Sequence, residues 1–178
     1  SEATNIAPFE LPILNSSNVL VPSKRIVQVM ADYESFQPTR YKDGLDPKTG
    51  KQMYSIGFGH QILDTDNLVE PILYQQAMDL LFNDSMSKAG LITNNMRRAG
   101  LLYNIRQCEL DALVCFTCSC GGRSEVTTAV IEYIKNKTSD NEKKLYDTWT
   151  SNGIYYAYYE DGERKTKLLQ PLVERRKR

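Results

Sequence analysis

The chain has 178 residues, enough for one compact domain with a sizeable core. Hydrophobic residues make up 41% of it and charged residues 25%, as in ordinary globular proteins. The 22 basic residues balance 22 acidic ones, so we expect no nucleic-acid partner. No apolar run is long enough to span a bilayer, so we exclude membrane insertion.

Residues 1–22 are predicted to form an extended N-terminal arm, because three prolines separate its short apolar pieces. The arm is expected either to pack on the body of the protein or to serve as a linker or docking segment. It has neither the basic leader nor the apolar core of a signal peptide, so none is predicted. The body of the protein is predicted to span residues 23–178.

Ser23 is a typical N-cap residue, and apolar residues recur at helical spacing after it until Pro38. Glu34 falls in the last turn of this predicted helix. The pattern then changes to turn sequences at Asp43-Gly44 and Asp46–Gly50, flanked by residues that suit strands. We therefore expect a small antiparallel sheet with one lengthened hairpin.

Helical periodicity dominates from Pro71 onward, with one short aromatic stretch, Tyr155–Tyr159, that suits an extended strand. The predicted fold class is α+β, with a sheet lobe over about residues 38–68 and a helical lobe over about residues 71–178. The predicted helices of the second lobe lie near residues 71–82, 84–98, 105–118, 124–136, 140–150 and 168–177.

The four cysteines, Cys108, Cys115, Cys118 and Cys120, crowd into the predicted helix near residues 105–118 and the residues just after it. Zinc sites usually join two ligand pairs over a longer separation, often with histidine. We favour reduced thiols that act as small buried hydrophobes, with a disulfide and a metal site as the alternatives. No metal and no cofactor are predicted.

Glu34 is the first candidate catalytic residue. It lies between Tyr33 and Phe36, and partial burial there would favour the neutral carboxyl group that a general acid needs. A solvated carboxylate at a helix end is the alternative reading. A second carboxyl group in a different environment would complete the pair that glycosidic bond cleavage requires.

Asp43 is the candidate for that second carboxylate, in a polar loop where it would stay ionised. Asp46 is its rival, because the insert leaves the register of the loop open. Ser55, on the following strand, would hold a water molecule between the two carboxyl groups. An acyl nucleophile is disfavoured at Ser55, because the Gly-x-Ser-x-Gly elbow is missing.

Gly57, Phe58 and Gly59 are predicted to contact the substrate. Glycine in a strand marks a bulge or a close approach by another group, and a flat sugar ring fits that description. His60 is the only histidine of the chain and follows the strand. We interpret it as a structural, hydrogen-bonding residue near the site, with a catalytic base as the alternative.

The segment from Glu34 to Asp43 resembles the Glu-Gly-x-x-x-x-x-Tyr-x-Asp motif of the phage-type lysozymes, the endolysin muramidases of glycoside hydrolase family 24. Tyr54–His60 is similar to the Thr-Ile-Gly-Tyr-Gly-His of that family. Weaker likeness continues in Gln75–Asp84, Gln107–Phe116 and Leu172–Arg176. The resemblance covers about residues 24–178 and implies a lysozyme-like fold with a cleft between its two lobes.

On this match Glu34, Asp43 and Ser55 fall on the Glu-Asp-Thr catalytic set of the family. The chain departs from the family pattern in three places. Serine replaces threonine at position 55 and so lacks the methyl group that fixes the rotamer. The loop between Asp43 and Ser55 is longer than usual, and Cys118–Gly121 replaces a Phe-Asn-x-Gly sequence, which makes Ser119 a candidate substrate contact.

The resemblance implies an N-acetylmuramidase that hydrolyses the β-1,4 bond between N-acetylmuramic acid and N-acetylglucosamine in peptidoglycan. A phage would use it for lysis or entry, from the host cytoplasm or from the virion, and the arm would contact other virion proteins. The alternatives are a lysozyme-fold docking module of a virion or secretion assembly, which the neutral charge favours, and a lytic transglycosylase that uses Glu34 alone.

Overall fold

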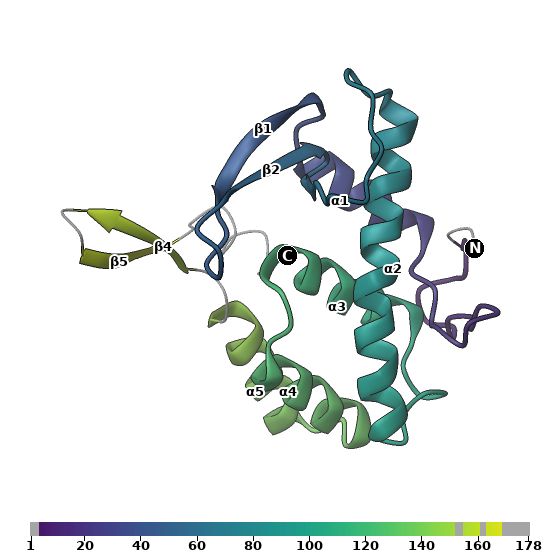
Figure 1. Ribbon diagram of the computed structural model, residues 1–178. Helices are drawn as coiled ribbons and strands as arrows, with labels where there is room; N and C mark the ends of the chain where they lie inside the picture. The colour runs from purple at the N-terminus through teal and green to yellow at the C-terminus, as the bar shows by residue number, and fades with distance from the viewer. Residues whose placement is uncertain (1–3, 152–154, 161–162, 169–178) are drawn as a thin grey trace. The chain divides into compact units, whose positions relative to one another are not determined.

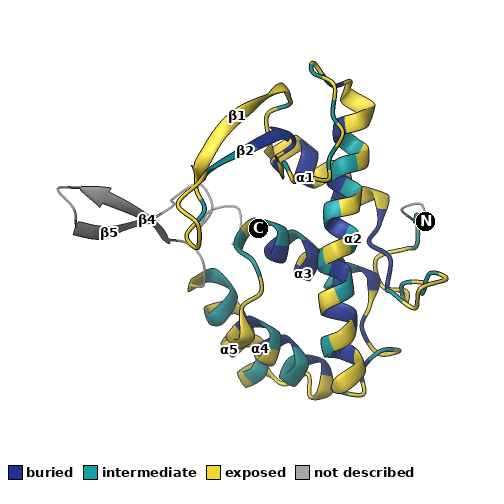
Figure 2. Cartoon of the chain, in the orientation of Figure 1, coloured by how far each residue is buried: buried dark blue, intermediate teal, exposed yellow. Residues whose placement is uncertain are grey.

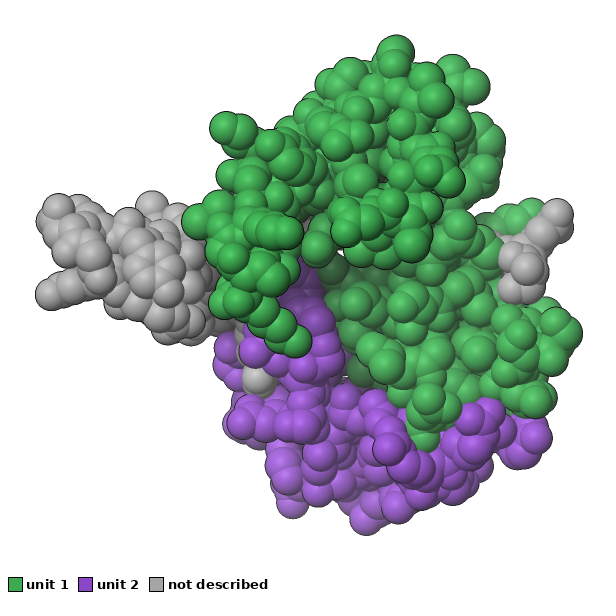
Figure 3. Space-filling model, viewed as in Figure 1, with its two compact units in different colours: residues 1–94, 105–118 green, residues 95–104, 119–178 purple. Residues whose placement is uncertain are grey.

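The computed structural model describes residues 4–151, 155–160 and 163–168. They belong to two compact units, one of residues 1–94 and 105–118 and one of residues 95–104 and 119–178 (Figure 3). Within the described ranges there are five helices and two small antiparallel sheets, so the predicted α+β class is confirmed. None of these helices is both long and apolar enough to cross a membrane.

The elements follow one another as labelled in Figure 1. They are α1 (Lys24–Tyr33), β1 (Gln37–Leu45), β2 (Gln52–Gly57), β3 (His60–Gln61), α2 (Tyr74–Arg98), α3 (Gln107–Cys120), α4 (Ser124–Lys135), α5 (Ser139–Ser151), β4 (Tyr155–Glu160) and β5 (Glu163–Leu168). The aromatic stretch lies in β4, as predicted. The helix predicted near residues 168–177 falls largely outside the described residues, and β5 occupies position 168.

Helix α2 corrects one prediction, because it is a single helix of 25 residues where two were expected. No glycine or proline interrupts the chain between the two predicted segments. The buried positions also keep helical spacing across the expected break, at Ala77, Leu81, Ser85 and Ala89. The helix ends only before Gly100, which has a φ of +74°.

The first sheet has the order β1-β2-β3, with antiparallel pairing throughout. Its long hairpin is closed by Asp46, whose N–H donates to the Lys51 carbonyl at 2.8 Å. The Asp46 carboxylate accepts the N–H of Lys48 at 2.8 Å, which is the usual way in which aspartate stabilises a turn. Strand β1 is exposed along its whole length, whereas the second half of β2 is buried (Figure 2).

The sheet packs on the N-terminal half of α2 within the first unit. A Cβ added at Gly57 would lie 3.0 Å from the Cβ of Ala77, so only glycine allows this approach. The ring of Phe58 contacts those of Phe36 and Tyr74, with centroids 5.7 and 5.5 Å apart. Because of this packing, the sheet groups with most of α2, which differs from the predicted division at about residues 68–71.

The described part of the N-terminal arm packs on the first unit, which was one of its predicted alternatives. The N–H groups of Gln107 and Cys108 donate to the carbonyls of Glu10 and Pro8, at 2.7 and 2.9 Å. These donors belong to the first turn of α3, whose N–H groups have no partner within the helix. The arm therefore caps α3.

A buried polar network joins the end of the arm to α1 and α3. Ser23 caps α1, as predicted, by accepting the N–H of Ile26 at 3.2 Å. The carboxylate of Asp111 accepts both the N–H and the hydroxyl group of Ser23. It also accepts the Gln107 amide, which donates to the Val21 carbonyl as well. All of the groups in this network lie in the first unit.

Candidate active site

Glu34 lies directly after α1, as the C-cap residue, with extended backbone angles of −103° and 152°. Its N–H donates to the Ala31 carbonyl at 3.2 Å. The side chain is exposed, so the predicted shielding between Tyr33 and Phe36 is wrong for this state of the protein. The physical reason is that α1 ends at Tyr33. Glu34 therefore lies outside the helix and is not part of its buried face.

Asp43 and Ser55 meet across the β1–β2 pair. Tyr41 is the direct partner of Ser55 in the register, and Asp43 lies two residues further along β1, on the same face. The Ser55 hydroxyl donates to Asp43 Oδ2 at 2.6 Å. Ser55 itself is fully buried. The predicted pair of hydroxyl and carboxylate is thus brought together, although Asp43 remains exposed at the surface.

The charge of Glu34 acts on the same place. Burial raises the pKa of Tyr41, and the negative charges of Asp43 and Glu34 raise it further. Both negative charges therefore act on the Tyr41 hydroxyl group. We call Glu34, Tyr41, Asp43 and Ser55 the carboxylate cluster. Sequence reasoning missed Tyr41, although its alternation with Asp43 along the strand placed both on one face.

Asp46, the rival of Asp43, has a different task in the structure. Its carboxylate holds the hairpin turn through the N–H of Lys48. It also lines a cavity of about 630 Å³ at the hairpin end of the sheet, together with Arg40, Lys51 and Tyr54. Among the two candidate aspartates, only Asp43 is hydrogen-bonded to Ser55.

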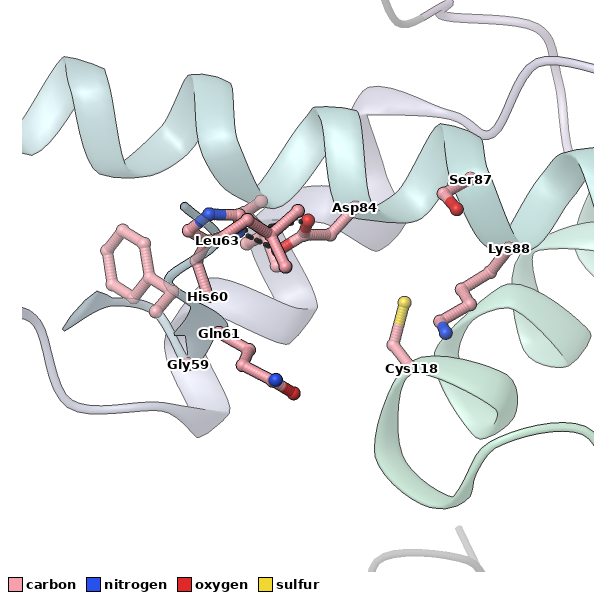
Figure 4. Close-up of a pocket in the computed structure, with 10 residues that line it drawn as sticks. Gly59, His60, Gln61, Leu63, Asp84, Ser87, Lys88 and Cys118 are labelled. Atoms are coloured by element: carbon pink, nitrogen blue, oxygen red, sulfur yellow. Dashed lines mark hydrogen bonds and ion pairs between the residues drawn. The ribbon is translucent and has the colours of Figure 1, made fainter. Parts of the chain in front are cut away.

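A cavity of about 340 Å³ lies within the first unit, beside β3 and α2. Figure 4 shows the side chain of Gln61, the thiol of Cys118 and the amino group of Lys88 around it. Its lining residues are Phe58, Gly59, His60, Gln61, Leu63, Leu81, Asp84, Ser87, Lys88 and Cys118.

The predicted substrate contacts differ in their access to this cavity. Phe58 and Gly59 line it, and Gly59 has open space beside its Cα atom. Gly57 does not line the cavity. Its backbone lies against helix α2, which leaves no room there for a sugar ring. Ser119 belongs to the second unit, and its role as a substrate contact stays a prediction.

His60 is buried beside the same cavity, with carboxylates at both ring nitrogens. Nδ1 lies 2.9 Å from Asp84 Oδ2, and Nε2 lies 2.8 Å from Asp66 Oδ2. The hydrogen bond to Asp84 is the largest of the effects that raise the pKa of His60 from 6.5 to about 9. Both nitrogens are thus occupied as donors, which leaves no lone pair for a catalytic base.

The family model described as phage lysozyme matches residues 31–178, which include the carboxylate cluster and all the residues that line the cavity of about 340 Å³. The chain belongs to the phage lysozyme family. No curated protein and no solved structure matches it closely enough to add a named relative. Membership in the phage lysozyme family makes the protein a muramidase-type hydrolase of the cell wall, with peptidoglycan as its substrate.

The charged histidine of this phage lysozyme should make its stability depend on pH. The pKa of His60 is higher in the folded state than the value of 6.5 expected for an unfolded chain. The contribution is therefore complete below about pH 6.5 and is lost as the pH rises through about 9. We expect it to reach about 2–3 kcal/mol, since half-exposed Asp84 leaves the pair partly screened by water.

Urea unfolding of the wild-type protein and of His60→Asn checks this expectation. The difference in unfolding free energy should be largest near pH 6 and should shrink by pH 10, where the wild-type histidine is neutral. The remaining difference at pH 10 measures the loss of packing and of the hydrogen bond that the neutral histidine still donates. A difference that stays constant between these two pH values would contradict the role of the charge.

The cysteines of this phage lysozyme are free thiols, but they are half-buried and not buried as predicted. Burial raises the pKa of Cys118 to about 11, so its thiol stays protonated and is a poor nucleophile at neutral pH. Within the described part of the chain, no three His, Cys, Asp or Glu side chains are grouped to hold a metal ion.

Proposed function

We propose that the protein is an N-acetylmuramidase that hydrolyses the β-1,4 bond between N-acetylmuramic acid and N-acetylglucosamine in peptidoglycan. The observation that carries this proposal is the carboxylate cluster. In it the Ser55 hydroxyl group donates to Asp43, and the charges of Asp43 and Glu34 both act on Tyr41. A carboxylate that accepts a hydroxyl group, with the charge of a second carboxylate acting on the neighbouring Tyr41, fits the needs of glycoside hydrolysis.

In this mechanism Glu34 donates a proton to the oxygen of the leaving sugar. Asp43 and Ser55 hold a water molecule, and Asp43 accepts its proton as the water attacks the anomeric carbon. The positive charge that develops on the sugar ring is stabilised by the ionised Asp43. Glu34 is exposed in the free protein, so we infer that the bound sugar itself removes water from the carboxyl group.

The proposal includes the substrate contacts that the cavity makes available. Phe58 and Gly59 lie at its wall and would meet a sugar or its substituent. Gln61 lines the same cavity and offers an amide group, which can donate and accept hydrogen bonds with the N-acetyl group of a sugar. We further propose that a phage uses the enzyme to degrade the wall during lysis or entry.

Digestion of purified peptidoglycan by the isolated chain tests this function. Hydrolysis should release fragments with reducing N-acetylmuramic acid ends, which mass spectrometry identifies. A lytic transglycosylase would instead release anhydro ends, lighter by one water molecule. Either intact sacculi or anhydro products would therefore contradict the proposed reaction.

Intact sacculi would favour the alternative of a docking module in a virion or secretion assembly. One observation supports a partner on the N-terminal arm. Phe9, Leu11 and Ile13 alternate along it and are 77%, 49% and 47% exposed. Large exposed apolar side chains on one segment are typical of protein contacts. We propose that other virion proteins bind there, which is compatible with wall-degrading activity.

A further inference from the structure

The cavity of about 340 Å³ beside β3 and α2 has an excess of positive charge on its wall. Among the residues that line it, His60, Asp84 and Lys88 are charged at neutral pH, since the pKa of His60 is about 9. His60 Nδ1 lies 2.9 Å from Asp84 Oδ2, so the charges of this pair balance each other. Asp66, at the other ring nitrogen, does not line this cavity. The charge of Lys88 is therefore not compensated on the cavity wall.

Lys88 extends its amino group toward this cavity from α2. Figure 4 shows the side chain reaching toward the thiol of Cys118, which belongs to α3. Among the residues that the structure describes, none forms a hydrogen bond or an ion pair with the Lys88 amino group. The side chain is half-buried, so part of its hydration is already lost. An ammonium group in this setting offers three hydrogen-bond donors and a positive charge to an anionic ligand.

The small side chain of Cys118 leaves room for such a ligand in front of Lys88. In the family pattern phenylalanine stands at position 118, whereas this chain has cysteine there. The thiol points into the cavity (Figure 4), so a phenyl ring at the same position would extend further into it. The replacement therefore keeps open the space that the amino group faces.

We propose that this cavity binds a carboxylate group of peptidoglycan, with Lys88 as the cation that holds it. The inference rests on the proposed muramidase function, because it names the part of the substrate that the cavity takes. All carboxylates of peptidoglycan belong to N-acetylmuramic acid, either to its lactyl group or to the peptide joined to it, and N-acetylglucosamine has none. The site therefore selects N-acetylmuramic acid and sets the register of the glycan chain in the enzyme.

Three soluble fragments test the site without hydrolysis. One is the disaccharide N-acetylglucosaminyl-N-acetylmuramic acid with its peptide. The second is the same disaccharide without the peptide, so that its lactyl carboxylate is free. The third carries the peptide with every carboxylate converted to an amide. None of them contains the bond that the enzyme is proposed to cleave, so titration calorimetry gives a Kd for the active protein.

Lys88→Gln should weaken the binding of a carboxylate-bearing fragment about tenfold, which is the effect of one charge-assisted hydrogen bond. The amidated fragment should bind Lys88→Gln and the wild type equally. Lys88→Arg keeps the charge and should bind within about threefold of the wild type. Lys24→Gln, at an exposed lysine of α1 that lines neither cavity, is the matched control. The fragment that shows the loss identifies the carboxylate as that of the peptide or of the lactyl group.

Four results would overturn the inference. The first is that neither carboxylate-bearing fragment binds the wild type at millimolar concentration. The second is that Lys88→Gln binds both as well as the wild type does. The third is an equal loss for the amidated fragment, because the charge would then meet no carboxylate. The fourth is unchanged binding by a folded Cys118→Phe variant, whose ring occupies the cavity. Melting temperatures show which variants fold, and the Lys88 variants decide alone if Cys118→Phe does not.

Digestion of purified sacculi keeps this inference apart from the proposed function. In that assay Lys88→Gln should raise KM with little change in kcat, whereas Glu34→Gln should lower kcat. Anhydro products or intact sacculi would contradict the proposed reaction, but the comparison of Kd values would still decide the carboxylate site. Normal hydrolysis by the wild type, with no effect of Lys88→Gln on KM or Kd, would overturn the carboxylate site alone.

Discussion

Glu34→Gln should lower the rate of peptidoglycan hydrolysis by about a thousandfold, since a general acid contributes roughly a hundredfold to ten-thousandfold. Glutamine keeps the shape of the side chain but has no proton of suitable acidity to give to the leaving oxygen. The side chain is exposed, so the unfolding free energy should change by less than about 0.5 kcal/mol. The rate of release of reducing ends from purified sacculi measures the effect.

Matched carboxylates of the same region provide the controls for this experiment. Asp32 is an exposed residue of α1 whose carboxylate accepts only the Gln28 amide, so Asp32→Asn should retain wild-type activity. Asp43→Asn should lose activity, whereas Asp46→Asn, in the hairpin turn, should not. Activity of Glu34→Gln within about threefold of the wild type would remove Glu34 from the mechanism.

Asp111→Ala should lower the free energy of unfolding by about 3–5 kcal/mol, because it leaves three buried donors without their acceptor and each unsatisfied group costs about 1–3 kcal/mol. Its carboxylate is 7% exposed and accepts three hydrogen bonds, two from Ser23 and one from Gln107. Without it, these donors are buried and unsatisfied. The start of α1 and the start of α3 would then lose their common attachment.

Urea unfolding at fixed pH measures this loss, when the curves of the wild type and the variant are analysed with a common m value. Asp79→Ala is the control, because Asp79 lies on exposed α2 surface and contacts only Gln75. It should change the unfolding free energy by less than about 0.5 kcal/mol. A loss below about 1 kcal/mol for Asp111→Ala would show that water or a rearranged Gln107 replaces the carboxylate.

Local sequence patterns determined the elements that depend on neighbouring residues. Ser23 caps α1, and Asp46 closes the long hairpin, because a side-chain oxygen and a backbone N–H only two or three residues apart can meet in one conformation. Strands β1, β2 and β4 and four of the five described helices were predicted on the same basis, whereas β3 and β5 were not. The break that was predicted inside α2 is the exception, and there the buried face of the helix continues without interruption.

The catalytic candidates Glu34, Asp43 and Ser55 came from residue types and from the family resemblance, and their roles remain predictions. The tertiary structure added the environment that the types do not specify. It made Glu34 exposed, because α1 ends before it. It selected Asp43 over Asp46 as the partner of Ser55, because the strand register brings distant residues opposite one another.

The sequence by itself therefore supplied the candidates for the catalytic residues and determined where most helices and turns lie, since both follow from side chains and local backbone preferences. Only the tertiary structure decided what surrounds these residues. It placed Tyr41 beside Ser55, gave His60 two carboxylate partners and filled the space beside Gly57 with Ala77. Most of these contacts join different elements of the fold, and the packing of α2 on the sheet brings Asp84 to His60 and Ala77 to Gly57.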